Sequence, residues 1–116
     1  MSTMAHAKKC HDLLILLDEM ESALRELSLW SEDPKDIPPK TAFLSSVPFC
    51  LDTMEFHQWL QYVFVSRMRD LISSGQSLPM TLKIHTVAEE YYRGKWRHHR
   101  RLLSCLRRVD QLFDAN

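Results

Sequence analysis

The chain has 116 residues, enough for one hydrophobic core and too few for two. Only 2 residues are glycine, 45% are hydrophobic, and no stretch alternates apolar with polar residues, so the composition favours an all-α fold over a β-sandwich or barrel. No segment approaches the roughly 20 apolar residues of a membrane span, and no signal peptide is recognisable, so we expect a cytoplasmic protein that does not contact the membrane. Cys10, Cys50 and Cys105 form no CxxC pair, so we expect reduced thiols and no disulfide framework.

The charge is balanced overall but unevenly distributed. Lys and Arg together number 15, as do Asp and Glu. Residues 1–82 carry 7 basic and 11 acidic side chains, whereas residues 83–116 carry 8 basic and 4 acidic ones. Such a division can steer a charged partner, or it can let one half of the molecule dock on the other.

The first predicted helix covers residues 5–30. Its leucines and Met20 recur every three or four residues, which is typical of an amphipathic helix with one core face. Prolines at 34, 38 and 39 cannot lie inside a helix, so a long connection follows. We expect residues 1–5 and 32–41 to be flexible, and the apolar part of the connection, residues 43–51, to pack on the helices.

The second predicted helix covers residues 53–73. Asp52 is placed to be its N-cap, with Glu55 as the capping-box acid and Leu51 as the first half of a hydrophobic staple. At 100° per residue Arg67 falls inside the apolar arc, so we expect a carboxylate from another helix to pair with it. Trp59 lies at the edge of that arc and is either a core residue or a half-exposed recognition residue.

Two further helices are predicted at residues 84–93 and 95–114, the last carrying Trp96 and an apolar face that ends at Phe113. Gly94 separates them. Residues 1–116 therefore form a single domain, a compact four-helix bundle with a long proline-containing loop between the first two helices.

No catalytic, phosphate-binding or metal-binding motif is present, so we expect no catalytic residue, no metal and no cofactor. His6 and Cys10 are spaced to share a metal but have no third ligand. Asp52, Glu55 and His57 have no nucleophile beside them. His98 and His99 point to different sides of a helix and are expected on a solvated face.

The strongest electrostatic feature is an arginine stripe on the last helix. On one continuous helix its members lie along one side and could bind a phosphate backbone, with RNA or another polyanion as the partner. The alternative is an ordinary solvated face, or one that pairs with the acidic first helix. The stripe consists of Arg93, Arg97, Arg100, Arg101, Arg107 and Arg108.

The segment "SSVPFCLDTMEFHQWLQYVFVSRMRDL" resembles the hallmark segment of the YqcC-like family of small bacterial proteins. The likeness extends through Trp30, "SLP" at residues 77–79 and "VDQLF" near the end, and so covers nearly the whole chain. The stretch "YYRGKWRHHRRLLSCLRR" is more basic than the family pattern, so the stripe is a property of this chain. The matching positions are Pro48, Phe49, Asp52, Thr53, Met54, Trp59, Leu60, Gln61, Arg67 and Met68.

The resemblance implies a helical bundle without an established activity, encoded beside a tRNA pseudouridine synthase in many bacteria. It does not imply synthase activity, because such enzymes have a much larger mixed α/β fold. Our leading hypothesis is a non-enzymatic interaction module, an accessory to tRNA modification that binds a protein partner. Direct RNA binding through the stripe is the alternative, and an unrecognised enzyme is the third reading. A homodimer is compatible with the broad apolar face of the second helix.

Overall fold

The computed structural model describes residues 3–114, and within them all regular structure is helical. Helix α1 is Thr3–Glu26, α4 is His85–Tyr91 and α5 is Arg100–Asp114. Between them, α2 (Phe56–Trp59), the π-helix η4 (Leu60–Val65) and α3 (Ser66–Ser73) run on as one rod. Short 3-10 turns, η1 (Pro34–Asp36), η2 (Lys40–Leu44) and η3 (Pro48–Cys50), occupy the long connection. These four rods confirm the predicted four-helix bundle.

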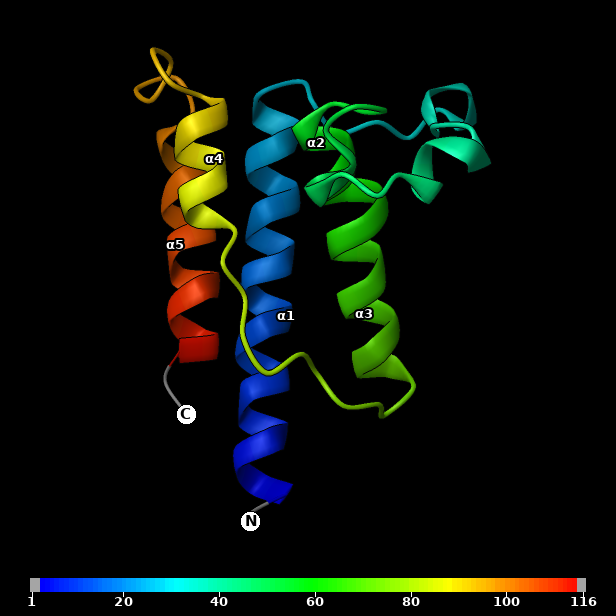
Figure 1. The fold of residues 1–116 in the computed structure, drawn as a ribbon. Helices are drawn as coiled ribbons and strands as arrows, with labels where there is room; N and C mark the ends of the chain where they lie inside the picture. Colours follow the sequence, from blue (N-terminus) through cyan, green and yellow to red (C-terminus); the bar gives the residue numbers. More distant parts are fainter. Residues whose placement is uncertain (1–2, 115–116) are drawn as a thin grey trace.

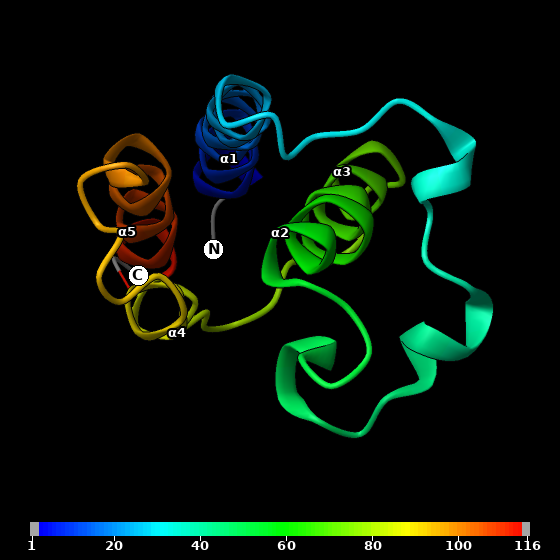
Figure 2. The ribbon, with the colours of Figure 1, turned by 90° about the horizontal axis from the view of Figure 1, so that it is seen from above.

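Figure 1 shows α1 as the longest helix, standing between α5 on one side and the α2–η4–α3 rod on the other. The short α4 lies against α5, and the connection after α3 crosses the lower part of the bundle to reach it. Seen from above, the segment between α1 and α2 makes a wide arc outside the second rod (Figure 2). Residues 3–5 lie in the first turn of α1, and residues 1 and 2 lie outside the described part of the chain.

The core is built mainly by the predicted apolar faces of α1 and α5. Burying such side chains stabilises the fold by about 1.5 to 3 kcal/mol each. Its largest fully buried members are Phe56, Phe113, Leu13, Leu17, Met20, Leu24, Leu60, Ile84, Leu102, Leu106, Val65 and Val109.

Ion pairs join α1 to its neighbours around this core. Arg101 of α5 lies 2.7 Å from Glu26, and Arg108 pairs with Glu19, about two turns closer to the N-terminus of α1. The basic half of the molecule thus docks on the acidic half. This is one of the two outcomes expected from the charge distribution.

A second set of ion pairs holds α3 to α1. Arg69 of α3 lies 2.9 Å from Asp18 and 3.0 Å from Glu21, and Arg25 approaches Glu21 as well. Burial raises the pKa of Glu21, but hydrogen bonds from Arg25 and Arg69 outweigh it and hold that pKa below its ordinary value.

Helix α1 ends at Glu26, four residues before the predicted end. Ser28 adopts the left-handed conformation, with φ of 60°, and the Leu29 and Ser28 amides donate to Leu24 and Arg25 at 2.8 and 3.0 Å. This is a Schellman motif, in which serine takes the place usually filled by glycine. The predicted helix was too long because Leu29 and Trp30 are apolar and continue the helical spacing. In the structure they pack on the core from the segment that follows the helix.

Helix α2 begins three residues later than predicted. The N-cap is Glu55, whose amide donates to the Gln58 side chain at 2.7 Å in a capping box. The expected capping role of Asp52 is therefore wrong, and its carboxylate accepts from the Ser45 hydroxyl instead. The hydrophobic staple is displaced in the same direction. Met54, the residue before the Glu55 cap, packs with Trp59 in one small cluster and takes the role expected of Leu51.

Helix α4 is capped from another helix. The Asp110 carboxylate of α5 accepts hydrogen bonds from the Ile84 amide at 3.1 and 2.9 Å and from the His85 amide at 2.9 Å. Ile84 itself has no side chain able to cap. Two amide groups that the helix start leaves without a partner are thus satisfied across the bundle.

Among residues 3–114, no helix is long and apolar enough to cross a bilayer.

Replacing the tertiary cap tests this arrangement. Asp110→Ala leaves two amides of α4 without a partner, so it should lower the free energy of unfolding by about 1 to 3 kcal/mol, measured by urea denaturation. The matched control is Asp114→Ala, which removes a carboxylate from the same helix where it is exposed and should change stability by less than about 0.5 kcal/mol. Equal losses in the two variants would contradict the capping role.

Thiol reactivity tests the packing between α1 and α5. Cys105 donates to the Leu16 carbonyl at 3.3 Å, and burial raises the pKa of its thiol to about 12. At pH 8 only about one Cys105 in ten thousand is therefore a thiolate. Mass-spectrometric mapping of a brief iodoacetamide treatment should find Cys10 alkylated and Cys105 untouched until the protein is unfolded. Modification of both at similar rates would show that the two helices separate readily.

Candidate functional site

The hallmark segment folds into a small cluster beside the main core. Ala42, Cys50 and Met54 are buried together, and Trp59 joins this cluster to the main core. The Phe49 ring meets Trp59 edge-on with ring centroids 4.7 Å apart. Of the two roles left open for Trp59, the structure supports packing.

The backbone at the start of this segment is strained. Phe49 and Cys50 have φ angles of 59° and 50°, which residues other than glycine rarely adopt. Pro48 is exposed, and the Thr53 hydroxyl closes the fold by donating to the Ala42 carbonyl at 2.7 Å. The expectation that residues 43–51 pack down holds only in part, because Leu44, Val47 and Leu51 are exposed, Leu44 to 81%.

Gln61 anchors the segment after α1 to the second rod. Its side-chain NH₂ group donates to the Ser31 carbonyl at 2.7 Å, and its side-chain oxygen accepts from the Ser31 amide at 3.1 Å. The side chain is buried, so both of its bonds replace contacts with water. A structural role accounts for this motif position.

Arg67 is exposed and forms no ion pair within the described part of the chain, so the expected carboxylate partner is wrong. Arg69 makes such pairs instead. The cause is η4, because a π-helical stretch turns less per residue than an α-helix and shifts every later side chain around the rod. Met68 is buried and Arg67 faces solvent as a result.

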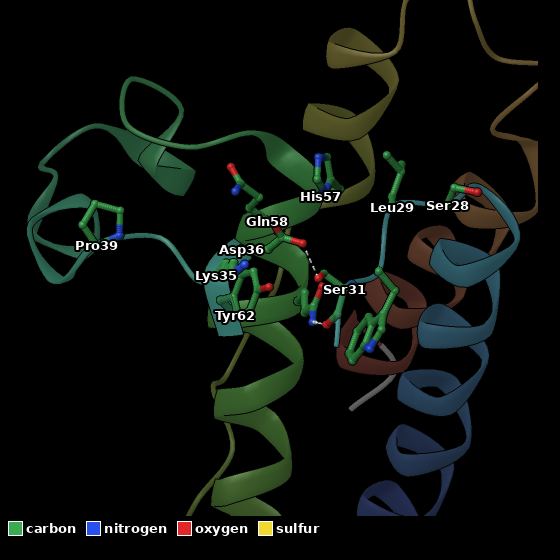
Figure 3. Close-up of a pocket in the computed structure, with 11 residues that line it drawn as sticks. Ser28, Leu29, Ser31, Lys35, Asp36, Pro39, His57, Gln58 and Tyr62 are labelled. Atoms are coloured by element: carbon green, nitrogen blue, oxygen red, sulfur yellow. Dashed lines mark hydrogen bonds between the residues drawn. The ribbon is translucent and has the colours of Figure 1, made fainter. Parts of the chain in front are cut away.

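A cavity of about 520 Å³ lies between the segment that follows α1, the turn η1, and the rod at α2 and η4 (Figure 3). Ser31, Asp36 and His57 all line it, the three residue types of a hydrolase triad. Their connections are wrong for that chemistry: the Ser31 hydroxyl donates to Asp36, whereas a nucleophile must donate to the imidazole. Burial lowers the pKa of His57, and its Nδ1 has no hydrogen-bond partner in the described structure.

His6 and Cys10 do lie together, with Nε2 and Sγ 3.5 Å apart. Within residues 3–114, however, no group of three or more His, Cys, Asp or Glu side chains is placed to hold a metal ion. These two residues therefore supply at most two of the four ligands that zinc usually takes.

The arginine stripe is not continuous. Gly94, with φ of 84°, ends the helical path after α4, and α5 starts only at Arg100. Arg93 lies on the far side of this break and pairs with Glu90 at 2.7 Å. The prediction that all six arginines line one side of a continuous helix is therefore wrong.

Internal partners occupy further members of the stripe. Arg101 and Arg108 bind the acidic side of α1, as described above. Arg97, Arg100 and Arg107 remain exposed and have no ion pair among the described residues. The stripe thus divides into paired and unpaired members.

The segment between α4 and α5 holds two residues that the sequence misplaced. Trp96 was expected in the core of the last helix but is 53% exposed. His99 was expected on a solvated face but is buried, with its ring stacked on Tyr92 at a centroid distance of 4.0 Å. The one available signal was Gly94, whose helix-breaking effect removes the basis for helical spacing beyond it.

A family model described as "DUF446: tRNA pseudouridine synthase C" matches residues 12–112. The chain belongs to this family. It is 35% identical to an uncharacterised protein of Haemophilus influenzae over 100 residues, 86% of this chain and 91% of that protein. The solution NMR structure of Escherichia coli YqcC has a TM-score of 0.78 and 31% identity, covering 92% of this chain and 89% of YqcC. The resemblance to YqcC-like proteins is confirmed.

A third relative differs in length. The chain is 38% identical over 85 residues to a Pectobacterium carotovorum protein named tRNA pseudouridine synthase C. The match covers 73% of this chain but only 22% of that protein. Most of the Pectobacterium protein therefore lies outside the region that resembles this chain.

The two motif residues Gln61 and Arg67 should differ sharply in their effect on stability. Gln61→Leu leaves the amide and carbonyl of Ser31 without partners, so we expect the free energy of unfolding to fall by about 1 to 3 kcal/mol. Arg67→Gln changes an exposed side chain and should stay within about 0.5 kcal/mol. Chemical denaturation monitored by circular dichroism measures both, and a larger effect at Arg67 would refute this assignment.

Proposed function

We propose that this chain is a non-catalytic interaction module that works with a tRNA pseudouridine synthase. The observation that carries the proposal is the Pectobacterium protein, which bears the synthase name and resembles this chain over 22% of its length. Joining two modules in one chain gives each a high effective concentration of the other. Such a fusion is useful when the two modules work together. In our proposal this chain and a separate synthase instead bind to each other as two proteins.

The geometry of the cavity favours a non-catalytic role for this chain. Ser31, Asp36 and His57 line it, but the hydroxyl is bound to the carboxylate and not to the imidazole. Gln61, the motif residue that lines it, is engaged in holding the fold together through its hydrogen bonds to Ser31. In our account the synthase chemistry belongs to the part of the Pectobacterium protein outside the match.

We assign the synthase contact to the surface of η2 and η3. Leu44, Val47 and Leu51 leave apolar surface exposed within eight positions of one another. The burial of Cys50 and the ring contact between Phe49 and Trp59 anchor this surface to the rest of the fold. A preformed apolar surface loses little conformational entropy on binding, which favours a specific protein contact.

Direct RNA binding is the second candidate, and it is favoured by the arginines that no internal carboxylate occupies. The stripe of six is not its site, because Arg93, Arg101 and Arg108 have acidic partners.

Association with the synthase is testable with purified proteins. The partner is the tRNA pseudouridine synthase of the same organism that corresponds to the unmatched part of the Pectobacterium protein. We expect a complex in analytical ultracentrifugation at micromolar concentration that survives ribonuclease treatment, and no pseudouridine formed by the chain alone.

Leu44→Asp tests the proposed contact surface, and Met80→Asp is its matched control, because both replace a strongly exposed apolar side chain. The first variant should lose the complex and the second should keep it. Pseudouridine formation by the isolated chain, or no complex under any condition, would refute the proposal.

A further inference from the structure

The turn between α4 and α5 gathers cations that nothing in the described structure neutralises. Lys95, Arg97 and Arg100 are all exposed, and none forms an ion pair with a described residue. No acidic side chain occurs between residues 91 and 109. The N-terminal end of α5, which is the positive end of its dipole, begins at Arg100 and adds to the field.

An exposed tryptophan lies in the middle of these cations. Trp96 is fixed by its indole N–H, which donates to the Glu89 carbonyl at 2.8 Å. Trp96, Arg97 and Arg100 together line a shallow hollow of about 560 Å³. Lys95, Arg97 and His98 line a second hollow of about 890 Å³, whose floor includes Leu27 and Leu29.

The turn is held in place by the buried His99 and by hydrogen bonds within the turn. His99 is buried under it, stacked on Tyr92, and its Nδ1 bonds to the Lys95 carbonyl at 2.9 Å. The Lys95 and His99 amides are also bonded within the turn, at 2.8 and 3.2 Å. The exposed side chains therefore project from a fixed support, which reduces the entropy lost on binding.

We propose that residues 95–100 form a contact site for single-stranded RNA. Trp96 stacks on an unpaired base, while Lys95, Arg97 and Arg100 bind the neighbouring phosphates. An aromatic face between cations is the usual means of binding single strands, since every base has a π-face and every linkage has a negative charge. A duplex clamp needs a longer cationic ridge, and pairing with α1 removes Arg101 and Arg108 from any such ridge.

This inference deepens the second candidate function, direct RNA binding, and does not rest on the proposed association with a synthase. It concerns the isolated chain, so it can fail while the synthase complex stands, and the reverse also holds.

Fluorescence anisotropy of the full chain with a labelled single-stranded RNA of about a dozen nucleotides tests the proposal. The duplex of the same length and unlabelled inorganic polyphosphate serve as comparisons. We expect the single strand to bind at least about fivefold more tightly than the duplex, and polyphosphate, which has no bases, to be a weak competitor. Absence of binding at low salt, or equal competition by polyphosphate, would overturn the proposal.

Two charge-matched double variants locate the site. Arg97→Gln with Arg100→Gln removes unpaired arginines and should weaken binding at least about tenfold, and should reduce the slope of log affinity against log salt by about 1.4. Arg101→Gln with Arg108→Gln removes the same charge from paired positions and should weaken binding less than about threefold. Equal losses of RNA affinity in the two double variants would show that RNA is attracted to the basic charge of the helix in general, and would overturn the proposed site.

Variants of the tryptophan test stacking. Trp96→Leu should weaken single-strand binding at least about fivefold, whereas Trp96→Phe, which keeps an aromatic face, should restore most of it. Circular dichroism of each variant verifies the fold. If Trp96→Leu binds as well as the parent while remaining folded, the tryptophan has no role in recognition and the proposal fails.

Discussion

The docking of a basic helix on an acidic one is the constraint on which the rest of this structure depends. Helix α1 presents Glu19 and Glu26 to α5, and Arg108 and Arg101 bind them. Exposed ion pairs of this kind contribute little stability each, so the buried apolar seam supplies most of the free energy. The buried apolar face of α5 sets which way the helix faces, and that orientation decides which arginines can pair with α1 and which stay available.

A second consequence concerns the end of the bundle. With Arg101 and Arg108 turned toward α1, the unpaired cations lie at the start of α5 and in the turn before it. Gly94 breaks the helix, and the burial of His99 holds the turn in place. Trp96 is thereby exposed among Lys95, Arg97 and Arg100, and the account of RNA contact rests on this local arrangement. The apolar surface at Leu44 belongs to a different part of the molecule and serves the proposed protein partner.

Much of the fold could be predicted from the sequence, because helical periodicity is a local signal. The core faces of α1 and α5 follow directly from leucine spacing, and the prolines at 34, 38 and 39 mark the long connection. The start of α2 was harder because Asp52 and Glu55 are both suitable caps, and tertiary contacts chose between them: Tyr91 donates to Glu55, while Ser45 donates to Asp52. The cap that Asp110 provides to α4 has no local signal at all.

The site was less predictable than the fold, for a physical reason in each case. One π-helical stretch in the second rod moved Arg67 out of the apolar arc. No residue pattern in "LQYVFV" predicts that this stretch is a π-helix. The arginines that are paired and those that are free look alike in the sequence, since the difference depends on which carboxylates α1 brings near. Only the three-dimensional arrangement separates Arg97 and Arg100 from Arg101 and Arg108.

Chemical-shift mapping by NMR can distinguish the free arginines from the paired ones, because it reports the contact surface of the unaltered protein. The ¹⁵N-labelled chain would be titrated with an unmodified tRNA transcript and the amide and indole signals followed. The account predicts that the largest changes fall on residues 95–100, including the Trp96 indole, with little change along the α1–α5 seam at Arg101 and Arg108. Changes centred on that seam, or spread evenly over α5, would contradict the division between paired and free arginines.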